Sequence, residues 1–80
     1  MRITVYGPGC DKCKKVFAAA EEAVRQAGVE ADVEKVEGVV DIARAGVMFT
    51  PGIAINGKVK ATGKVPDVAK IVEWIKQAQG

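Results

Sequence analysis

A run of β-branched and aromatic residues, Ile3 to Tyr6, stops at the tripeptide Gly7-Pro8-Gly9 and gives way to a helical pattern. The run predicts a buried strand, because strands favour such residues and because glycine and proline interrupt regular structure. From Asp11 onward apolar side chains recur every three or four residues, which predicts an amphipathic helix. Its apolar positions are Cys13, Val16, Phe17, Ala20, Val24 and Ala27, and Gly28 supplies the stop.

The middle of the chain predicts a strand and a short helix. Ala31 and Val33 alternate with acidic residues, the pattern of a strand with one solvated face, which we place at a sheet edge. The segment 38–45 is a weak helix candidate closed by Gly46. The apolar run 47–49 then leads to Thr50-Pro51, where proline interrupts any strand.

The last third predicts a hairpin and a final helix. Segments 53–55 and 58–61 are joined by Asn56-Gly57, the pair that best tolerates positive φ at both central positions of a tight turn. Pro66 and Asp67 suit the first turn of a helix. The buried stripe of that helix is predicted to be Val68, Ile71, Val72, Ile75 and Ala78.

The order β-α-β-α-β-β-α places the chain in the α/β class. A βαβ unit followed by an antiparallel hairpin closes most simply into a mixed four-stranded sheet with helices on both faces. With 80 residues, the chain is long enough for one domain, which we place at residues 1–80.

Composition excludes several classes of function. A net charge of +2, with acidic and basic residues interspersed, gives no electrostatic footprint for nucleic acid. The apolar runs are far shorter than the roughly 20 residues that a membrane-spanning helix needs. The first residues contain no long hydrophobic segment typical of a secretory signal, so we expect a cytoplasmic protein.

The two cysteines, Cys10 and Cys13, are the residues most suited to chemistry. Small disulfide scaffolds carry more cysteines, and cytosolic thiols are kept reduced, so a structural staple is not expected. Cys10 falls at the predicted helix N-cap, where the helix dipole, Lys12 and Lys14 lower the pKa of a thiol and favour the nucleophilic thiolate, while Asp11 opposes this shift and keeps it moderate. Cys13 continues the apolar stripe. An exposed attacking thiol and a sheltered resolving thiol are what thiol–disulfide exchange requires.

These motifs resemble the small redox-active disulfide proteins of the thioredoxin superfamily, in bacteria and archaea. The resemblance rests on the segment 7–13, on Thr50-Pro51 before a hairpin and on Gly63-Lys64-Val65-Pro66 before the last helix. It implies a glutaredoxin-sized thioredoxin-like fold with dithiol–disulfide oxidoreductase activity. It also implies that a cis peptide bond precedes Pro51 and that Thr50 offers its backbone to an extended substrate.

The predicted site includes residues around this centre. Gly9, Thr50, Pro51, Met48 and Phe49 are the candidate substrate-binding residues, with core packing as the alternative for Met48 and Phe49. Pro8, Tyr6 and Lys12 are expected to support the site structurally.

The resemblance implies protein disulfides as substrates and a separate thioredoxin-reductase-like protein as electron donor. We expect no bound organic cofactor, no metal and a monomer. Glutaredoxins carry an aromatic residue within the cysteine motif and a Gly-Gly-Asp element, whereas this chain has Asp11-Lys12 and a lone Asp67, so glutathione use is not predicted.

Two alternatives use the same residues differently. A soft-metal carrier would bind copper or zinc between the two thiolates. However, copper-chaperone domains run β-α-β-β-α-β and end in a strand, whereas this chain is predicted to end in a helix. A redox-inactive binding module on the same fold is the second alternative.

Overall fold

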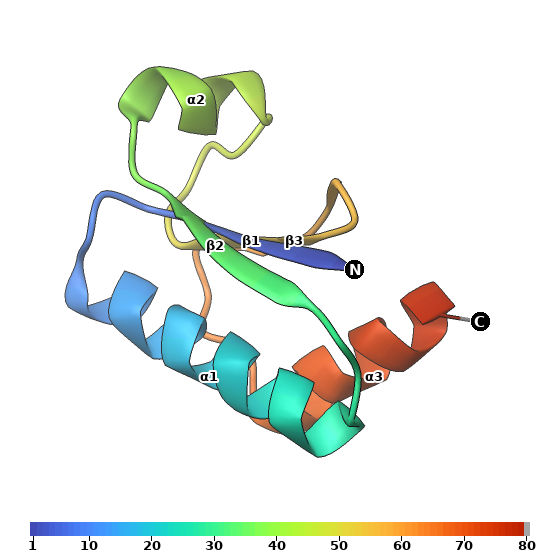
Figure 1. The fold of residues 1–80 in the computed structure, drawn as a ribbon. Coiled ribbons are helices and arrows are strands. Elements are labelled where there is room, and N and C mark those ends of the chain that lie inside the picture. The colour runs from blue at the N-terminus through green and yellow to red at the C-terminus, as the bar shows by residue number, and fades with distance from the viewer. Residues whose placement is uncertain (80) are drawn as a thin grey trace.

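The structure of the protein is a computed structural model that describes residues 1–79. Gly80, the last residue of the predicted domain, lies outside the described residues. Within residues 1–79 the elements follow the predicted order (Figure 1). They are β1 (Arg2–Tyr6), α1 (Asp11–Ala27), β2 (Asp32–Val36), α2 (Val39–Arg44), β3 (Gly52–Ile55), β4 (Lys58–Thr62) and α3 (Val68–Gln79).

The four strands form one mixed sheet in the order β2-β1-β3-β4. The central strand β1 pairs in parallel with β2 and antiparallel with β3, and β3 continues antiparallel into β4. Figure 1 shows α1 and α3 together on one face of the sheet and α2 on the other. The predicted thioredoxin-like architecture, with helices on both faces, is therefore confirmed.

The core lies between the sheet and the pair α1 and α3. Successive side chains of a strand point to opposite faces, and Ile3 and Val5 of β1 point toward these helices. Their neighbours in β3, Ile53 and Ile55, are paired with them and equally buried. The helices contribute Val16, Ala20, Ala23, Ile71 and Ile75.

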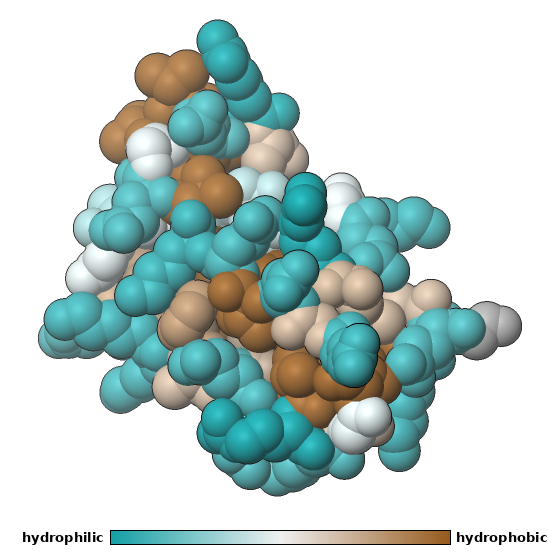
Figure 2. All heavy atoms as spheres, in the orientation of Figure 1, coloured by the Kyte–Doolittle hydropathy of each residue, from teal (hydrophilic) through white to brown (hydrophobic). Residues whose placement is uncertain are grey.

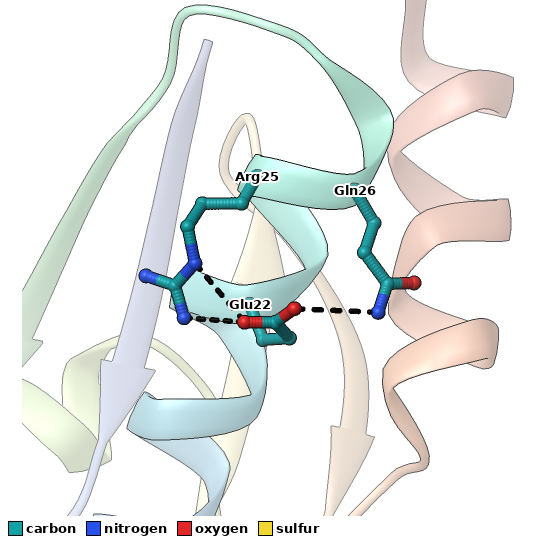
Figure 3. A network of polar contacts seen from close by, with 3 residues as sticks. All are labelled: Glu22, Arg25 and Gln26. Atoms are coloured by element: carbon teal, nitrogen blue, oxygen red, sulfur yellow. Dashed lines mark hydrogen bonds and ion pairs between the residues drawn. The ribbon is translucent and has the colours of Figure 1, made fainter.

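Helix α1 follows its prediction closely. Cys10 is its N-cap, and Gly28 ends it in the left-handed conformation with φ 66° and ψ 31°. On the solvent side near its end, Arg25 and Gln26 donate hydrogen bonds to the Glu22 carboxylate (Figure 3). The hydrogen bond from Arg25, followed by that from Gln26, holds the pKa of Glu22 below its usual range. Among the buried residues of α1, Ala23 is the one that the apolar periodicity did not predict.

The β3–β4 hairpin is confirmed at Asn56-Gly57, whose φ angles are 51° and 84°. Asn56 also fixes the end of the central strand, because its backbone N–H donates to the Arg2 carbonyl and its Oδ1 accepts from the Arg2 N–H. The turn thus closes the hairpin and anchors it to β1.

The predicted boundaries were wrong in three places. Strand β2 starts at Asp32 and runs to Val36. Helix α3 starts at Val68, so Pro66 and Asp67 precede its first turn, and the Asp67 carbonyl accepts the first backbone hydrogen bonds. Ala78 is exposed rather than buried, because the end of α3 extends beyond the core.

Of the helices within residues 1–79, none has the length and apolar character needed to cross a membrane.

Packing between α3 and the sheet predicts that truncating a buried aliphatic side chain costs much more stability than truncating an exposed one. Ile71 is fully buried, so Ile71→Ala should lower the free energy of unfolding by about 2–5 kcal/mol through lost burial and a cavity. Val39→Ala, at an exposed position of α2, is the matched control and should change it by less than about 0.5 kcal/mol. Urea denaturation followed by circular dichroism measures both; equal effects would contradict this placement of the core.

Candidate active site

The two cysteines form a disulfide at the amino end of α1. Cys10 and Cys13 are bonded, with their Cα atoms 5.1 Å apart. As the N-cap, Cys10 accepts a hydrogen bond on Sγ from the Cys13 backbone N–H at 3.2 Å. The same donor and the unpaired N–H groups of the first helical turn stabilise negative charge on this sulfur when the disulfide is opened.

The two sulfur-bearing residues differ strongly in exposure. Cys10 is exposed, whereas Cys13 is 5% exposed and belongs to the buried face of α1. Cys10 is therefore the more accessible residue of the pair, and Cys13 is the sheltered one.

Gly7 makes room for the buried sulfur. A Cβ atom placed on Gly7 would overlap Cys13 Sγ and would lie 3.9 Å from Cβ of Thr50. The Gly7 N–H donates to the Val36 carbonyl at 2.9 Å, which fixes this close approach to the end of the sheet. Glycine is required here for space.

Gly9 shapes the loop directly before Cys10. Its φ is +90°, a conformation that side chains other than glycine rarely adopt. A Cβ atom on Gly9 would also lie 3.3 Å from Oε2 of Glu37, so Glu37 borders the loop. Gly9 and Pro8 are both exposed beside Cys10.

The segment Thr50-Pro51 lies across the loop from the cysteines. The peptide bond between these residues is cis, as the resemblance implied. Thr50 is exposed and lies near Gly7, whereas Pro51 is fully buried. The Pro51 carbonyl accepts a hydrogen bond from the Gly63 N–H at 2.8 Å. Pro51 thus anchors the segment in the interior of the protein, and Thr50 faces solvent.

An apolar groove of about 480 Å³ adjoins this segment. It lies between Pro8, Thr50, Met48 and the side of α2 that carries Val39. Figure 2 shows hydrophobic surface at the top of the molecule, where Figure 1 places α2. Met48 is 86% exposed, so core packing is wrong for it.

Phe49 is also exposed, at 68%, and lies against Gly63 rather than in this groove. The three residues of the run 47–49 therefore differ in burial: Val47 is buried against Gly52, whereas Met48 and Phe49 are exposed.

Of the other two residues predicted to support the site, Lys12 lies between the cysteines and Tyr6 lies away from them. Tyr6 points to the face of the sheet opposite Cys13, because Val5 faces the core and side chains alternate along β1. It borders a surface hollow with Arg2, Thr4 and Glu34. Lys12 is exposed on the first turn of α1 and does not line the cavity beside Cys13.

Sequence reasoning placed Lys14 near the cysteines but missed two other charged residues next to Cys13, Lys35 and Glu37. Lys14, Lys35 and Glu37 line a cavity of about 270 Å³ together with Cys13. Lys35 lies near the carboxyl end of β2 and Glu37 directly follows this strand, and the parallel register Val5↔Lys35 brings this end beside the loop after β1. The available signal was the βαβ prediction itself, since carboxyl ends of neighbouring parallel strands meet at one edge of the sheet.

Comparison with known proteins identifies the family of this chain. Residues 1–76 match the family described as Thioredoxin domain. The chain belongs to the thioredoxin family. A thioredoxin of Methanothermobacter thermautotrophicus is 37% identical over 71 residues, which are 89% of this chain and 92% of that protein. A thioredoxin of Methanocaldococcus jannaschii is 36% identical over 74 residues, 92% of this chain and 85% of that protein. The chain is thus a thioredoxin-like thiol–disulfide oxidoreductase with a redox-active Cys-x-x-Cys motif.

The close approach at Gly7 generates a prediction for this thioredoxin-like centre. Gly7→Ala should displace Cys13, slow dithiothreitol-driven insulin reduction by at least about tenfold, and lower stability by about 1–3 kcal/mol. Gly38→Ala is the matched control, because its added Cβ meets only the flexible Asp41 carboxylate. Turbidity assays and urea denaturation measure the two effects. Wild-type reduction rates in Gly7→Ala would show that the sulfur position is not constrained here.

Proposed function

We propose that the protein is a protein-disulfide reductase in which Cys10 is the nucleophile and Cys13 the resolving thiol. The observation that carries the proposal is the unequal pair at the start of α1, with Cys10 exposed as the N-cap and Cys13 buried. Membership of the thioredoxin family supports the same chemistry.

The reaction transfers two electrons and begins from the reduced dithiol. The Cys10 thiolate attacks one sulfur of the substrate disulfide, forming a mixed disulfide and releasing the other substrate sulfur as a thiolate that takes up a proton. The Cys13 thiolate then attacks Sγ of Cys10 and releases the second substrate thiolate. The substrate ends as a dithiol, and the protein ends with the Cys10–Cys13 disulfide seen in the structure.

Substrate docking uses the surface around Thr50. The exposed Thr50 backbone binds an extended substrate segment, and Gly9 leaves space for it beside Cys10. Met48 and Phe49 supply apolar contacts on the outer side, since both are largely exposed next to this segment. Pro51, buried beneath Thr50, shapes the surface without reaching the substrate.

Glu37 and its neighbours provide the proton chemistry of the resolving step. Cys13 must lose a proton before it attacks Cys10, and it is shielded from bulk water. The cavity beside it is lined by Glu37, Lys14 and Lys35, and the Lys35 ammonium lies 4.7 Å from the centre of the Phe17 ring. Glu37 accepts the Cys13 proton within this cavity, and the two ammonium groups favour the resulting thiolate.

The disulfide itself is the redox group, so the cycle needs no bound organic cofactor or metal. A separate thioredoxin-reductase-like protein returns two electrons to the Cys10–Cys13 disulfide after each turnover. The protein acts as a monomer on disulfide-containing proteins in the cytoplasm.

The unequal roles of the cysteines predict two different phenotypes. In dithiothreitol-driven insulin reduction, Cys10→Ser should abolish catalysed turnover, because the attacking sulfur is lost. Cys13→Ser, reduced beforehand, freed of dithiothreitol and then mixed with insulin, should accumulate a mixed disulfide between Cys10 and insulin, because the chain has no second thiol to resolve it. Turbidity measures the first effect, and non-reducing mass spectrometry measures the second.

Ala18→Ser, on the exposed side of α1, is the control and should keep the wild-type rate. Trapping by Cys10→Ser instead of Cys13→Ser would reverse the assigned roles. A wild-type protein that gives no acceleration but retains Cu(I) stoichiometrically against a chelator would establish the soft-metal carrier instead. A protein that does neither would contradict both the reductase and the metal carrier, and leave the redox-inactive binding module as the remaining alternative.

The role of Glu37 predicts a change in the resolving step. Glu37→Gln should slow release of substrate from the mixed disulfide by about tenfold, because the side chain no longer accepts a proton. The deficit should shrink as pH rises and solvent hydroxide removes the Cys13 proton directly. Glu30→Gln, an exposed change on the connection before β2, is the control. Quenched-flow measurement across pH tests this; a pH-independent deficit would assign Glu37 to structure instead.

A further inference from the structure

A second groove lies away from the disulfide, between β4 and α3. It has a volume of about 740 Å³ and is lined by Val59–Thr62 of β4, by the connection 64–67 and by Lys70 and Trp74 of α3. The apolar part of the groove comes from Val59, Val65 and Trp74. Neither cysteine lines it, so it is separate from the candidate active site.

One wall of this groove is an open sheet edge. Strand β4 pairs only with β3 among the strands of residues 1–79, and it is the last strand of the sheet. Its outer side therefore presents backbone N–H and C=O groups that an additional extended chain can pair with. Residues Val59–Thr62 of this strand line the groove, and the register shift in the β3–β4 pair falls at Lys60 among them.

The positive charge of the groove favours an acidic ligand. Lys60, Lys64 and Lys70 line it, against a single acidic residue, Asp67. Lys70 lies 3.7 Å from Glu73 and 6.0 Å from the centre of the Trp74 ring. Lys60 and Lys64 have no acidic partner within 4.0 Å in residues 1–79. Two ammonium groups are thus available for carboxylates of a ligand.

We propose that this groove binds an extended acidic segment of a partner protein, which adds to β4 as a fifth strand. Its backbone pairs with β4, its carboxylates pair with Lys60 and Lys64, and its apolar side chains pack on Ala61 and Trp74, which lie on the same side of the sheet. The occupant is a peptide because a strand edge recognises a peptide backbone.

A second copy of this chain does not fit the edge. Antiparallel pairing of two β4 strands would bring Lys58 and Lys60 of one copy close to the same residues of the other, and like charges across a strand pair are destabilising. Lys60 is also the extra residue where the β3–β4 register shifts, a device that discourages unselective edge pairing. The lysine charges therefore disfavour a basic strand and favour an acidic one.

Trp74 supplies the test, because it is the only tryptophan of the chain and lines the groove. A capped peptide of about six residues, with alternating glutamate and valine, has the usual length of a strand. Added to the full chain, it should change Trp74 fluorescence saturably, with a Kd that rises with salt. The double variant Lys60→Glu/Lys64→Glu should raise this Kd by about tenfold or more. Lys12→Glu/Lys76→Glu, with equal charge reversal outside the groove, should leave it unchanged.

Three further arms identify the mode of binding. A peptide of the same sequence with methylated backbone nitrogens should not bind, because it cannot pair with β4. Equal binding of that peptide, or of a peptide with lysine in place of glutamate, would overturn the proposal. Tighter binding of an oligothymidylate, or a β4-dependent dimer in light scattering that excludes the peptide, would do the same. Cys10→Ser should bind the acidic peptide like wild type, so failure of the exchange chemistry and failure of this site are separable.

Discussion

The close approach of Gly7 to Cys13 is the constraint on which the redox centre depends. Because residue 7 has no side chain, the first turn of α1 can place a sulfur directly over the end of the central strand. The same geometry leaves Cys10 as the N-cap, where its sulfur accepts the Cys13 N–H. Burial of one thiol and exposure of the other thus follow from one local arrangement, the step from β1 through Gly7-Pro8-Gly9 into α1.

The sheet topology brings the remaining parts of the site to this step. β1 is paired in parallel with β2 and antiparallel with β3, so the end of β1, the end of β2 and the start of β3 meet at one edge. The end of β2 contributes Glu37, and the start of β3 follows Thr50-Pro51. Segments separated by more than forty residues in the chain surround one sulfur pair for this reason alone.

Local patterns allowed prediction of most of the fold, and long-range register explains the errors. The N-cap at Cys10, the stop at Gly28 and the turn at Asn56-Gly57 depend on neighbouring residues, so the sequence alone predicts them. The register shift in the β3–β4 pair depends on a partner strand, and periodicity does not report it. Ala78 continues the apolar period of α3, yet the core ends before it.

The residues of the site fall into the same two groups, those that local motifs predict and those that long-range strand pairing brings in. Cys10, Cys13 and Thr50-Pro51 are recognisable as motifs, whereas Lys35 and Glu37 reach the cavity only through pairing of β2 with β1. Gly63 links the site to the groove along β4: its N–H donates to Pro51, and Phe49 packs against it. A chain bound along β4 therefore lies on the strand that leads into the loop holding Pro51. The proposed substrate docking at Thr50 and the proposed strand addition at β4 therefore lie on either side of one connection, the hydrogen bond between Gly63 and Pro51.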